Sequence, residues 1–280
     1  MTKPNDIVPA PLSVADVSLV VRDLARVSTF YQRMIGLQPL ATDRTEHVLG
    51  AGGQPLLRLR ADPQARLADR HAAGLFHTAF LMPNRADLGA WLHHALAADR
   101  ARLSGASDHA VSEALYLADP EGNGIEIYTD RPRAQWRWVG AAVEMSTMPL
   151  DVDDLLRAAR PRWQGVPEAT RIGHVHLQVG DIDTAEAFYR DRLGLATTHH
   201  RPGARFFASG GYHHHIATNT WHSAGAGGRT NATTGLAAMT LEATSDGEYA
   251  PVEDRTRYLD PWGIVVDVVP RTASSRTLAS

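Results

Sequence analysis

The segment VVRDLARVSTFYQRMIGL, residues 20–37, has a counterpart in QVGDIDTAEAFYRDRLGL, residues 178–195. The same spacing between the copies persists as far as the paired glycines at 52–53 and 210–211. A whole unit has therefore been duplicated, and not only a helix motif. Identical aligned pairs include Asp23 and Asp181, Phe30 and Phe188, Tyr31 and Tyr189, and Gly36 and Gly194.

Each copy predicts a strand, a capped helix and further strands. The runs DVSLVV and HVHLQV alternate apolar residues with others, which is typical of a strand with one buried face. An Asp near each helix start can cap free backbone N–H groups. In the first copy Val27, Phe30, Tyr31 and Met34 recur at helical spacing, so these residues are predicted to pack against the strands.

A second pair of segments extends the repeat. GLFHTAFLMP at 74–83 resembles GLAAMTLEA at 235–243, and DPEGNGIEIY at 119–128 resembles DPWGIVVDVV at 260–269. The later copy lacks the equivalent of the helical segment ADLGAWLHHALAAD at 86–99.

The sequence therefore predicts an α+β fold built from four βαβββ units. Two of them form an N-terminal pair in residues 1–130 and two a C-terminal pair in residues 171–280, with the last unit shortened. The linker at 131–170 contains Pro132, Pro149 and Pro161 and a short helical pattern, DVDDLLRAAR. The four units span residues 12–70, 74–130, 171–222 and 233–270.

Composition narrows the functional classes. The chain has 28 Lys and Arg against 31 Asp and Glu, so it has no basic excess and we expect no nucleic-acid partner. The sequence contains neither an apolar run of membrane-spanning length nor a signal-peptide pattern, which predicts a cytoplasmic protein without a membrane anchor. Because there are no cysteines and 14 histidines, any metal is expected to be held by histidine and carboxylate.

The repeat, together with the runs GASDHAVSEALYLADPEGNGIEIYTDRP and GGYHHHIATNTW, resembles the vicinal oxygen chelate superfamily. This superfamily includes glyoxalases, bleomycin-resistance proteins and extradiol dioxygenases, and the two runs are most similar to two-domain catechol 2,3-dioxygenases. The resemblance covers nearly the whole chain. It implies that βαβββ units pair into incomplete β-barrels. A metal inside the barrel is then held by a His from the first strand of one unit, and by a His and a Glu from the first and last strands of its partner.

The resemblance assigns these ligand positions residue by residue. A complete His-His-Glu set arises only if units two and three combine, so we predict pairing of modules 2+3 and 1+4. Pairing within the N-terminal half would instead bring together Asp16, His77 and Glu126. The ligand positions are Asp16 in unit one, His77 and Glu126 in unit two, His174 in unit three, and Ala238 and Asp267 in unit four.

Two imidazoles and one carboxylate suit a divalent first-row metal, and a facial set of this kind points to Fe(II), with Mn(II) as the alternative. The resemblance then implies an extradiol dioxygenase of aromatic hydrocarbon catabolism, which takes a small aromatic diol and O2. Self-association into a homo-oligomer is common in the superfamily.

The resemblance also marks catalytic candidates. In ring-cleaving relatives a catalytic His lies three residues before an Ala, and this spacing selects His214. On a strand, adjacent side chains point to opposite faces, so only some of the tract 213–215 would lie inside the barrel. Tyr116 stands ten residues before Glu126, the spacing of the family's active-site tyrosine. His109 resembles a substrate-contacting His but is closer to Tyr116 than in well-known relatives, and His176 is a lesser candidate.

Other interpretations stay open at this point. His77 and Tyr116 are also compatible with ordinary packing roles, and the histidine tract with a solvated edge. A glyoxalase-like isomerase or epimerase would use more carboxylate, which Asp16 would supply under the N-terminal pairing. A metal-free protein that sequesters a ligand would need no metal at all.

Overall fold

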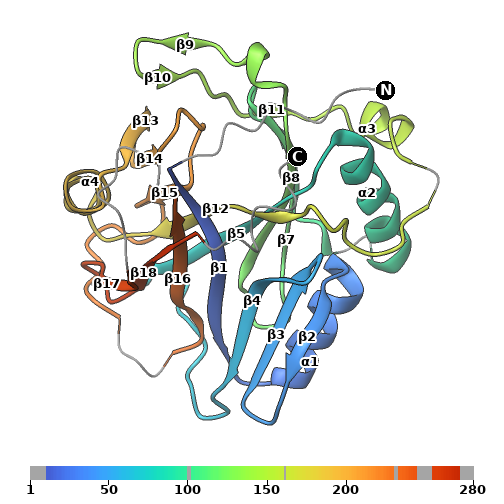
Figure 1. The fold of residues 1–280 in the computed structure, drawn as a ribbon, viewed down its shortest axis with the longest axis horizontal. Helices are drawn as coiled ribbons and strands as arrows, with labels where there is room; N and C mark the ends of the chain where they lie inside the picture. Colours follow the sequence, from blue (N-terminus) through green and yellow to red (C-terminus); the bar gives the residue numbers. More distant parts are fainter. Residues whose placement is uncertain (1–10, 100–101, 161, 230–232, 245–253, 272–280) are drawn as a thin grey trace.

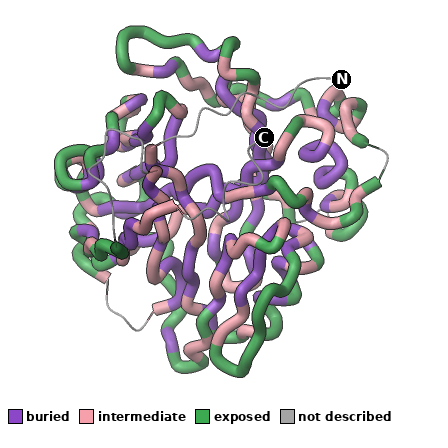
Figure 2. Tube along the Cα trace, viewed as in Figure 1, coloured by how far each residue is buried: buried purple, intermediate pink, exposed green. Residues whose placement is uncertain are grey.

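The computed structural model describes residues 11–99, 102–160, 162–229, 233–244 and 254–271. Its strands form two large, curled sheets, with the helices on their outer sides (Figure 1). The purple, buried stretches in Figure 2 follow the strands of both sheets, where the hydrophobic core lies. In the part of the chain that is described, no helix has the length and apolar character needed to cross a membrane.

The nine-stranded sheet combines units two and three. Its strand order is β11-β6-β7-β8-β5-β12-β15-β14-β13, and the two units meet where β5 pairs antiparallel with β12. Its strands are β5 (Gly74–Leu81), β6 (Gly105–Asp108), β7 (Ser112–Ala118), β8 (Gly124–Asp130), β11 (Met148–Pro149), β12 (Arg171–Gln178), β13 (Ala196–Arg201), β14 (Ala204–Ala208) and β15 (Ile216–Asn219).

The seven-stranded sheet combines units one and four. Its order is β17-β18-β16-β1-β4-β3-β2, and β1 pairs antiparallel with β16. The predicted pairing of modules 2+3 and 1+4 is therefore confirmed, and pairing within the N-terminal half is wrong. Its strands are β1 (Leu12–Val21), β2 (Gln38–Thr42), β3 (Glu46–Ala51), β4 (Gln54–Ala61), β16 (Gly235–Ala243), β17 (Thr256–Leu259) and β18 (Val265–Pro270).

The helices begin where the sequence predicts. Asp23 caps α1 (Leu24–Phe30) by accepting a hydrogen bond from the Arg26 N–H, and Asp181 caps α4 (Ile182–Glu186) through the Thr184 N–H. Both helices continue as π-helical turns, η1 (Tyr31–Ile35) and η4 (Ala187–Arg192). The unit-two helix α2 (Arg85–Asp99) matches the segment that unit four lacks.

The repeated tyrosine in these helices ties consecutive units together. The Tyr189 hydroxyl in unit three donates to Asp260 Oδ2 in unit four at 3.0 Å. The Tyr31 hydroxyl in unit one makes the equivalent, longer contact of 3.5 Å to Asp119 Oδ2 in unit two. Each barrel pairs different units, so these bonds connect one barrel to the other.

The linker also has structure. A 3-10 turn, η3 (Arg133–Gln135), leads into a hairpin of β9 (Trp138–Val139) and β10 (Ala142–Val143), which projects from one end of the molecule (Figure 1). β11 then adds to the edge of the nine-stranded sheet by pairing with β6, and α3 (Val152–Arg157) forms the predicted short helix.

We predict that Tyr189→Phe lowers the free energy of unfolding by about 1–3 kcal/mol, because it removes a buried donor from the Asp260 carboxylate. Tyr31→Phe is the matched control and should cost less, since its contact to Asp119 is longer. Urea unfolding followed by circular dichroism measures both. A larger loss for the Tyr31 variant would contradict this view of the contacts between units.

Candidate metal centre

Three adjacent strands in the middle of the nine-stranded sheet bring His77, Glu126 and His174 together. His77 lies on β5, Glu126 on β8 and His174 on β12, and β5 is hydrogen-bonded to both of the others. Because residues two apart on a strand share a face, the diagonal neighbours His77 and His174 meet on the inner face. All three side chains are buried.

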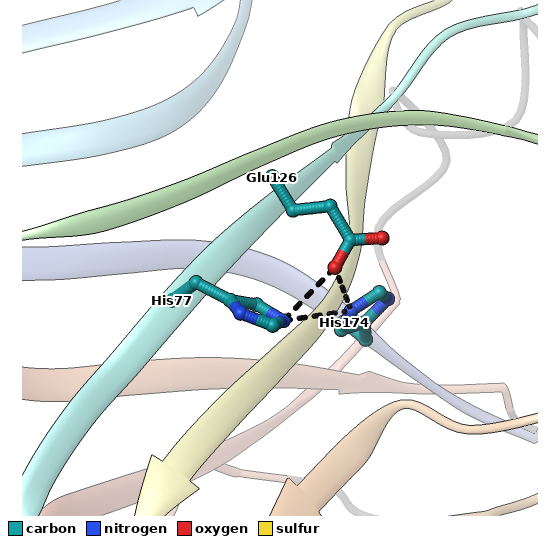
Figure 3. Close-up of side chains that lie close together, drawn as sticks. All are labelled: His77, Glu126 and His174. Carbon is teal, nitrogen blue, oxygen red and sulfur yellow. Dashed lines mark hydrogen bonds and ion pairs between the residues drawn. The ribbon is translucent and has the colours of Figure 1, made fainter. Parts of the chain in front are cut away.

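The three side chains point their donor atoms at one another (Figure 3). The Glu126 Oε2 atom lies 3.0 Å from His77 Nε2 and 3.3 Å from His174 Nε2. The two Nε2 atoms are 3.3 Å apart. Each residue thus offers one ligand atom to a common point.

The surroundings of His174 and Glu126 favour the protonation states that metal ligands require. Desolvation lowers the pKa of His174 to about 4, although Glu126 acts in the opposite direction, so this imidazole is neutral at pH 7. Burial raises the pKa of the Glu126 carboxyl, but the neighbouring His174 and His77 outweigh it and hold that pKa well below the usual value. The site therefore combines the neutral imidazole of His174 with the carboxylate of Glu126.

A divalent cation fits this arrangement. A metal about 2.0–2.1 Å from each donor, with angles between octahedral and tetrahedral values, separates its ligand atoms by roughly 2.8–3.4 Å. The triangle of 3.0, 3.3 and 3.3 Å matches that expectation. Across the described ranges, this is the one group of three or more His, Asp or Glu residues whose ligand atoms converge in this way.

The triad lines a cavity of about 280 Å³. Aromatic rings form part of its wall, and Phe76, His176 and Trp221 pack against one another with ring centroids 4.9–5.5 Å apart. A cavity of this size with a mainly apolar lining and a few convergent polar groups is typical of a small-molecule site.

Tyr116 and His109 form a hydrogen-bonded pair in the cavity wall. His109 Nε2 lies 2.7 Å from the Tyr116 hydroxyl, and its Nδ1 lies 2.7 Å from the Ser146 carbonyl oxygen. A carbonyl only accepts, so Nδ1 carries the proton and, in the neutral ring, Nε2 accepts from Tyr116. Desolvation, followed by the charge of Glu126, raises the pKa of Tyr116 well above its usual value.

The histidine tract is placed differently from the expectation. Strand β15 begins only at Ile216, so residues 213–215 lie on irregular backbone and the expected strand alternation is wrong. All three imidazoles are buried. His214 lines the cavity, with its ring centroid 4.1 Å from that of His174. His213 bonds Asp130, and His215 Nδ1 accepts from the Ser209 N–H at 3.4 Å.

His176 also lines the cavity, two residues beyond His174. Its Nε2 lies 3.0 Å from the Asn219 amide nitrogen, while the Asn219 oxygen accepts from the Trp221 N–H. This orientation makes His176 Nε2 an acceptor. Burial, and then the neighbouring His77, lowers the pKa of His176 well below its usual value.

Sequence reasoning missed the contribution of the linker and of strand β13. Met145, Ser146 and Thr147 line the cavity, together with Arg201 at the end of β13. The Arg201 guanidinium holds this stretch of the linker through Thr147 Oγ1 at 2.8 Å and the Met145 carbonyl at 3.3 Å. No motif marks these residues, because their role depends on where the linker crosses the barrel.

The equivalent positions in the other barrel are filled by ion pairs. Asp16 lies 3.2 Å from Arg58, and Asp267 makes two contacts of 2.8 and 2.9 Å to Arg257. The inward His position is Ala238. The arrangement Asp16, His77 and Glu126 is therefore not formed, since Asp16 belongs to the seven-stranded sheet.

A fold of paired βαβββ units around a buried His-His-Glu centre defines a class of metal-site proteins, and the comparisons with known proteins place this chain within it. The family model "Glyoxalase/Bleomycin resistance protein/Dioxygenase superfamily" matches residues 13–127 and 171–266. The chain belongs to this superfamily.

Individual relatives agree with that assignment. A protein of Bacillus subtilis (strain 168) named catechol-2,3-dioxygenase is 40% identical over 246 residues, covering 86% of each chain. Among solved structures, a putative dioxygenase from the same species aligns with a TM-score of 0.58 at 13% identity, over 96% of this chain and 86% of that one. Glyoxalase I from Zea mays aligns with a TM-score of 0.54 at 13% identity, over 95% of each chain. Both of these solved structures share the fold of this chain.

We predict that Glu126→Gln sharply lowers the content of bound divalent metal after anaerobic purification, because an amide replaces the anionic ligand. Asp267→Asn is the matched control, since it makes the same chemical change at the equivalent position of the other barrel and should leave metal content unchanged. Elemental analysis measures both. Equal metal content in the Glu126 variant and the unchanged protein would argue against this centre.

Acid should destabilise the metal-free protein. Desolvation lowers the pKa of buried His215 to about 3, against about 6.5 in an unfolded chain. Between these values the unfolded state binds more protons, so the free energy of unfolding falls as the pH falls. His215 alone should contribute a loss of about 2 kcal/mol between pH 7 and pH 5.

Urea unfolding at the two pH values tests this prediction, with His215→Asn as the comparison. The variant should lose less stability on acidification, whatever its stability at pH 7. An identical loss in both proteins would rule out the contribution of His215.

Proposed function

We propose that this protein is an extradiol ring-cleaving dioxygenase that inserts O2 into a small catechol-type diol. The observation that supports it most is the His77, Glu126 and His174 triad opening onto a cavity with aromatic walls. A facial set of two His and one carboxylate with open positions is typical of non-haem Fe(II) oxygenases. The relative named catechol-2,3-dioxygenase, at 40% identity over 86% of the chain, supports the same reaction.

His77, Glu126 and His174 would hold Fe(II), with Mn(II) as the alternative. When bound, the metal supplies the charge that favours the catecholate and the redox chemistry that lets O2 react with it. The chain's own residues must therefore orient the diol, exclude water and handle its protons. Both oxygen atoms enter the product as the ring carbon–carbon bond beside the diol breaks.

The cavity residues suit these tasks. In its bonded state with neutral His109, the Tyr116 hydroxyl donates to His109, so its oxygen is free to accept a hydrogen bond from a diol hydroxyl. His214 lines the same cavity and is a candidate acid-base group. Burial, and then His174, lowers the pKa of His214 well below its usual value, so at neutral pH the ring has a nitrogen that accepts a proton.

The isomerase alternative has less support. It requires additional carboxylate, for which Asp16 was the candidate, and Asp16 is paired with Arg58 in the other barrel. Among the described residues that line the cavity, Glu126 is the single carboxylate. In a metal-free protein that only sequesters a ligand, the convergence of His77, Glu126 and His174 would have no function.

The decisive experiment measures metal content and oxygen uptake on the same anaerobically purified protein. We expect bound iron or manganese, and O2 consumption that depends on an added catechol and yields a yellow ring-opened product. A panel of substituted catechols should be tried after reconstitution with Fe(II) and, separately, Mn(II). Absence of oxygen uptake across this panel would contradict the proposal.

We predict that Tyr116→Phe lowers kcat for catechol-dependent oxygen uptake by about 10²-fold while metal content is retained, because the hydroxyl contacts the diol and not the metal. Tyr258→Phe, on strand β17 of the other barrel, is the control and should behave as the unchanged protein. Loss of metal in the Tyr116 variant would instead indicate a role in holding the centre.

A further inference from the structure

A buried chain of hydrogen bonds runs from Asp130 through His213 to His214. Asp130 Oδ1 lies 2.9 Å from His213 Nε2, and His213 Nδ1 lies 2.7 Å from His214 Nδ1. The His213 side chain has no exposed surface, and that of Asp130 is 14% exposed. The chain ends at the cavity, because His214 forms part of its wall.

The Asp130 carboxylate determines which atom donates in each hydrogen bond of this series. A carboxylate accepts, so the proton between Asp130 and His213 belongs to His213 Nε2. In a neutral ring the other nitrogen, Nδ1, must then be an acceptor. His214 Nδ1 lies within hydrogen-bond distance of it and therefore carries a proton. This leaves His214 Nε2 without one.

The surroundings hold Asp130 and His213 in place. The Tyr212 hydroxyl donates to Asp130 Oδ2 at 2.9 Å, and the Tyr128 hydroxyl lies 2.8 Å from that of Tyr212. Since the Tyr212 proton is used by Asp130, Tyr128 donates to the Tyr212 oxygen. The His213 ring packs against both Tyr212 and Trp136, with ring centroids 4.1 and 5.1 Å away, and these two rings also contact each other. The ring is therefore fixed with Nε2 toward the carboxylate.

The irregular backbone at residues 213–215 is what permits the contact. On a strand, adjacent side chains point to opposite faces, and the Nδ1 atoms of His213 and His214 would not meet. Here the stretch precedes β15, and the two ring centroids are 4.6 Å apart. Thus one histidine faces the cavity while its neighbour connects it to Asp130.

We propose that Asp130 and His213 are positioning residues that fix the tautomer of His214, so that its Nε2 is the proton acceptor available in the cavity. The use of that acceptor rests on the function proposed above. A diol hydroxyl would break its O–H bond and form an N–H bond at His214 Nε2, leaving the oxygen with the electron pair. Throughout, His214 Nδ1–H stays bonded to His213.

Nitrogen-15 NMR of the histidine rings in the full-length, metal-free protein tests the tautomers directly, because protonated and bare ring nitrogens resonate in separate ranges. His213→Gln and His214→Gln assign the two sets of signals. We expect a proton on Nε2 of His213 and on Nδ1 of His214. A proton on His214 Nε2 in the unchanged protein would overturn the proposal.

Asp130→Asn provides the second test, because an amide can either donate or accept and so no longer dictates the direction. We expect His214 to become a mixture of tautomers, and kcat for oxygen uptake to fall at least tenfold with KM for the catechol within twofold. Asp267→Asn should change neither the His214 signals nor kcat. An unchanged His214 tautomer in the Asp130 variant would refute the role of Asp130.

The two proposals fail separately. If the unchanged protein consumes no O2 with any catechol, the dioxygenase proposal is lost, but the NMR signals still decide whether Asp130 and His213 set the His214 tautomer. If oxygen uptake is present and the tautomers are reversed, the positioning proposal fails alone.

Discussion

The antiparallel pairing of β5 with β12 is the contact on which the candidate centre depends. It joins units that are separated by the whole linker, and its register places His77 opposite His176 and diagonal to His174. The three candidate ligands come from three strands: β5 supplies the imidazole of His77, β8 the carboxylate of Glu126, and β12 the imidazole of His174. No single strand therefore supplies the whole set. A buried carboxylate without a partner is costly, so the pairing both builds the site and requires something to balance Glu126.

The other barrel balances its buried acidic residues in a different way. Its strands occupy equivalent places, but Ala238 replaces the His of β5, and the two acidic residues at ligand positions are paired with arginines. Asp267 is almost fully buried and is contacted by Arg257 through both oxygens. The charge in this barrel is therefore balanced from within the chain. Duplication has left one barrel with a convergent donor set and the other with a structural ion-pair set.

Most of the fold could be predicted from the sequence, because the signals that determine it lie close together along the chain. The Asp caps, the apolar periodicity and the repeated Phe-Tyr pair all act within one unit, so they can be read along the chain. The pairing of units was also accessible, because only one combination completes a His-His-Glu set. That argument depended on the family resemblance and not on periodicity.

The parts that sequence could not supply are those decided by tertiary contacts. The histidine tract was expected on a strand, but the backbone that precedes β15 is irregular, and this makes the His213 to His214 contact feasible. Ser146 lies far from any motif, yet its carbonyl determines which nitrogen of His109 is protonated. The first case turns on a local backbone conformation and the second on a hydrogen bond between segments distant in sequence, and a pattern of residue types gives no signal for either.

Electrostatics connects the centre with the rest of the cavity. Burial lowers the pKa of His174, His176 and His214, whereas the contacts of His174 and His77 lower the pKa of Glu126 and favour its charged form. Among the described residues that line the cavity, Arg201 is the one permanent cation, and its guanidinium is bonded to the linker. The converging donor atoms of His77, Glu126 and His174 form a place where a divalent cation would further balance this charge. Under the proposed function, the burial that favours a neutral His174 also favours a neutral His214, so one physical condition would serve both metal binding and acid-base chemistry.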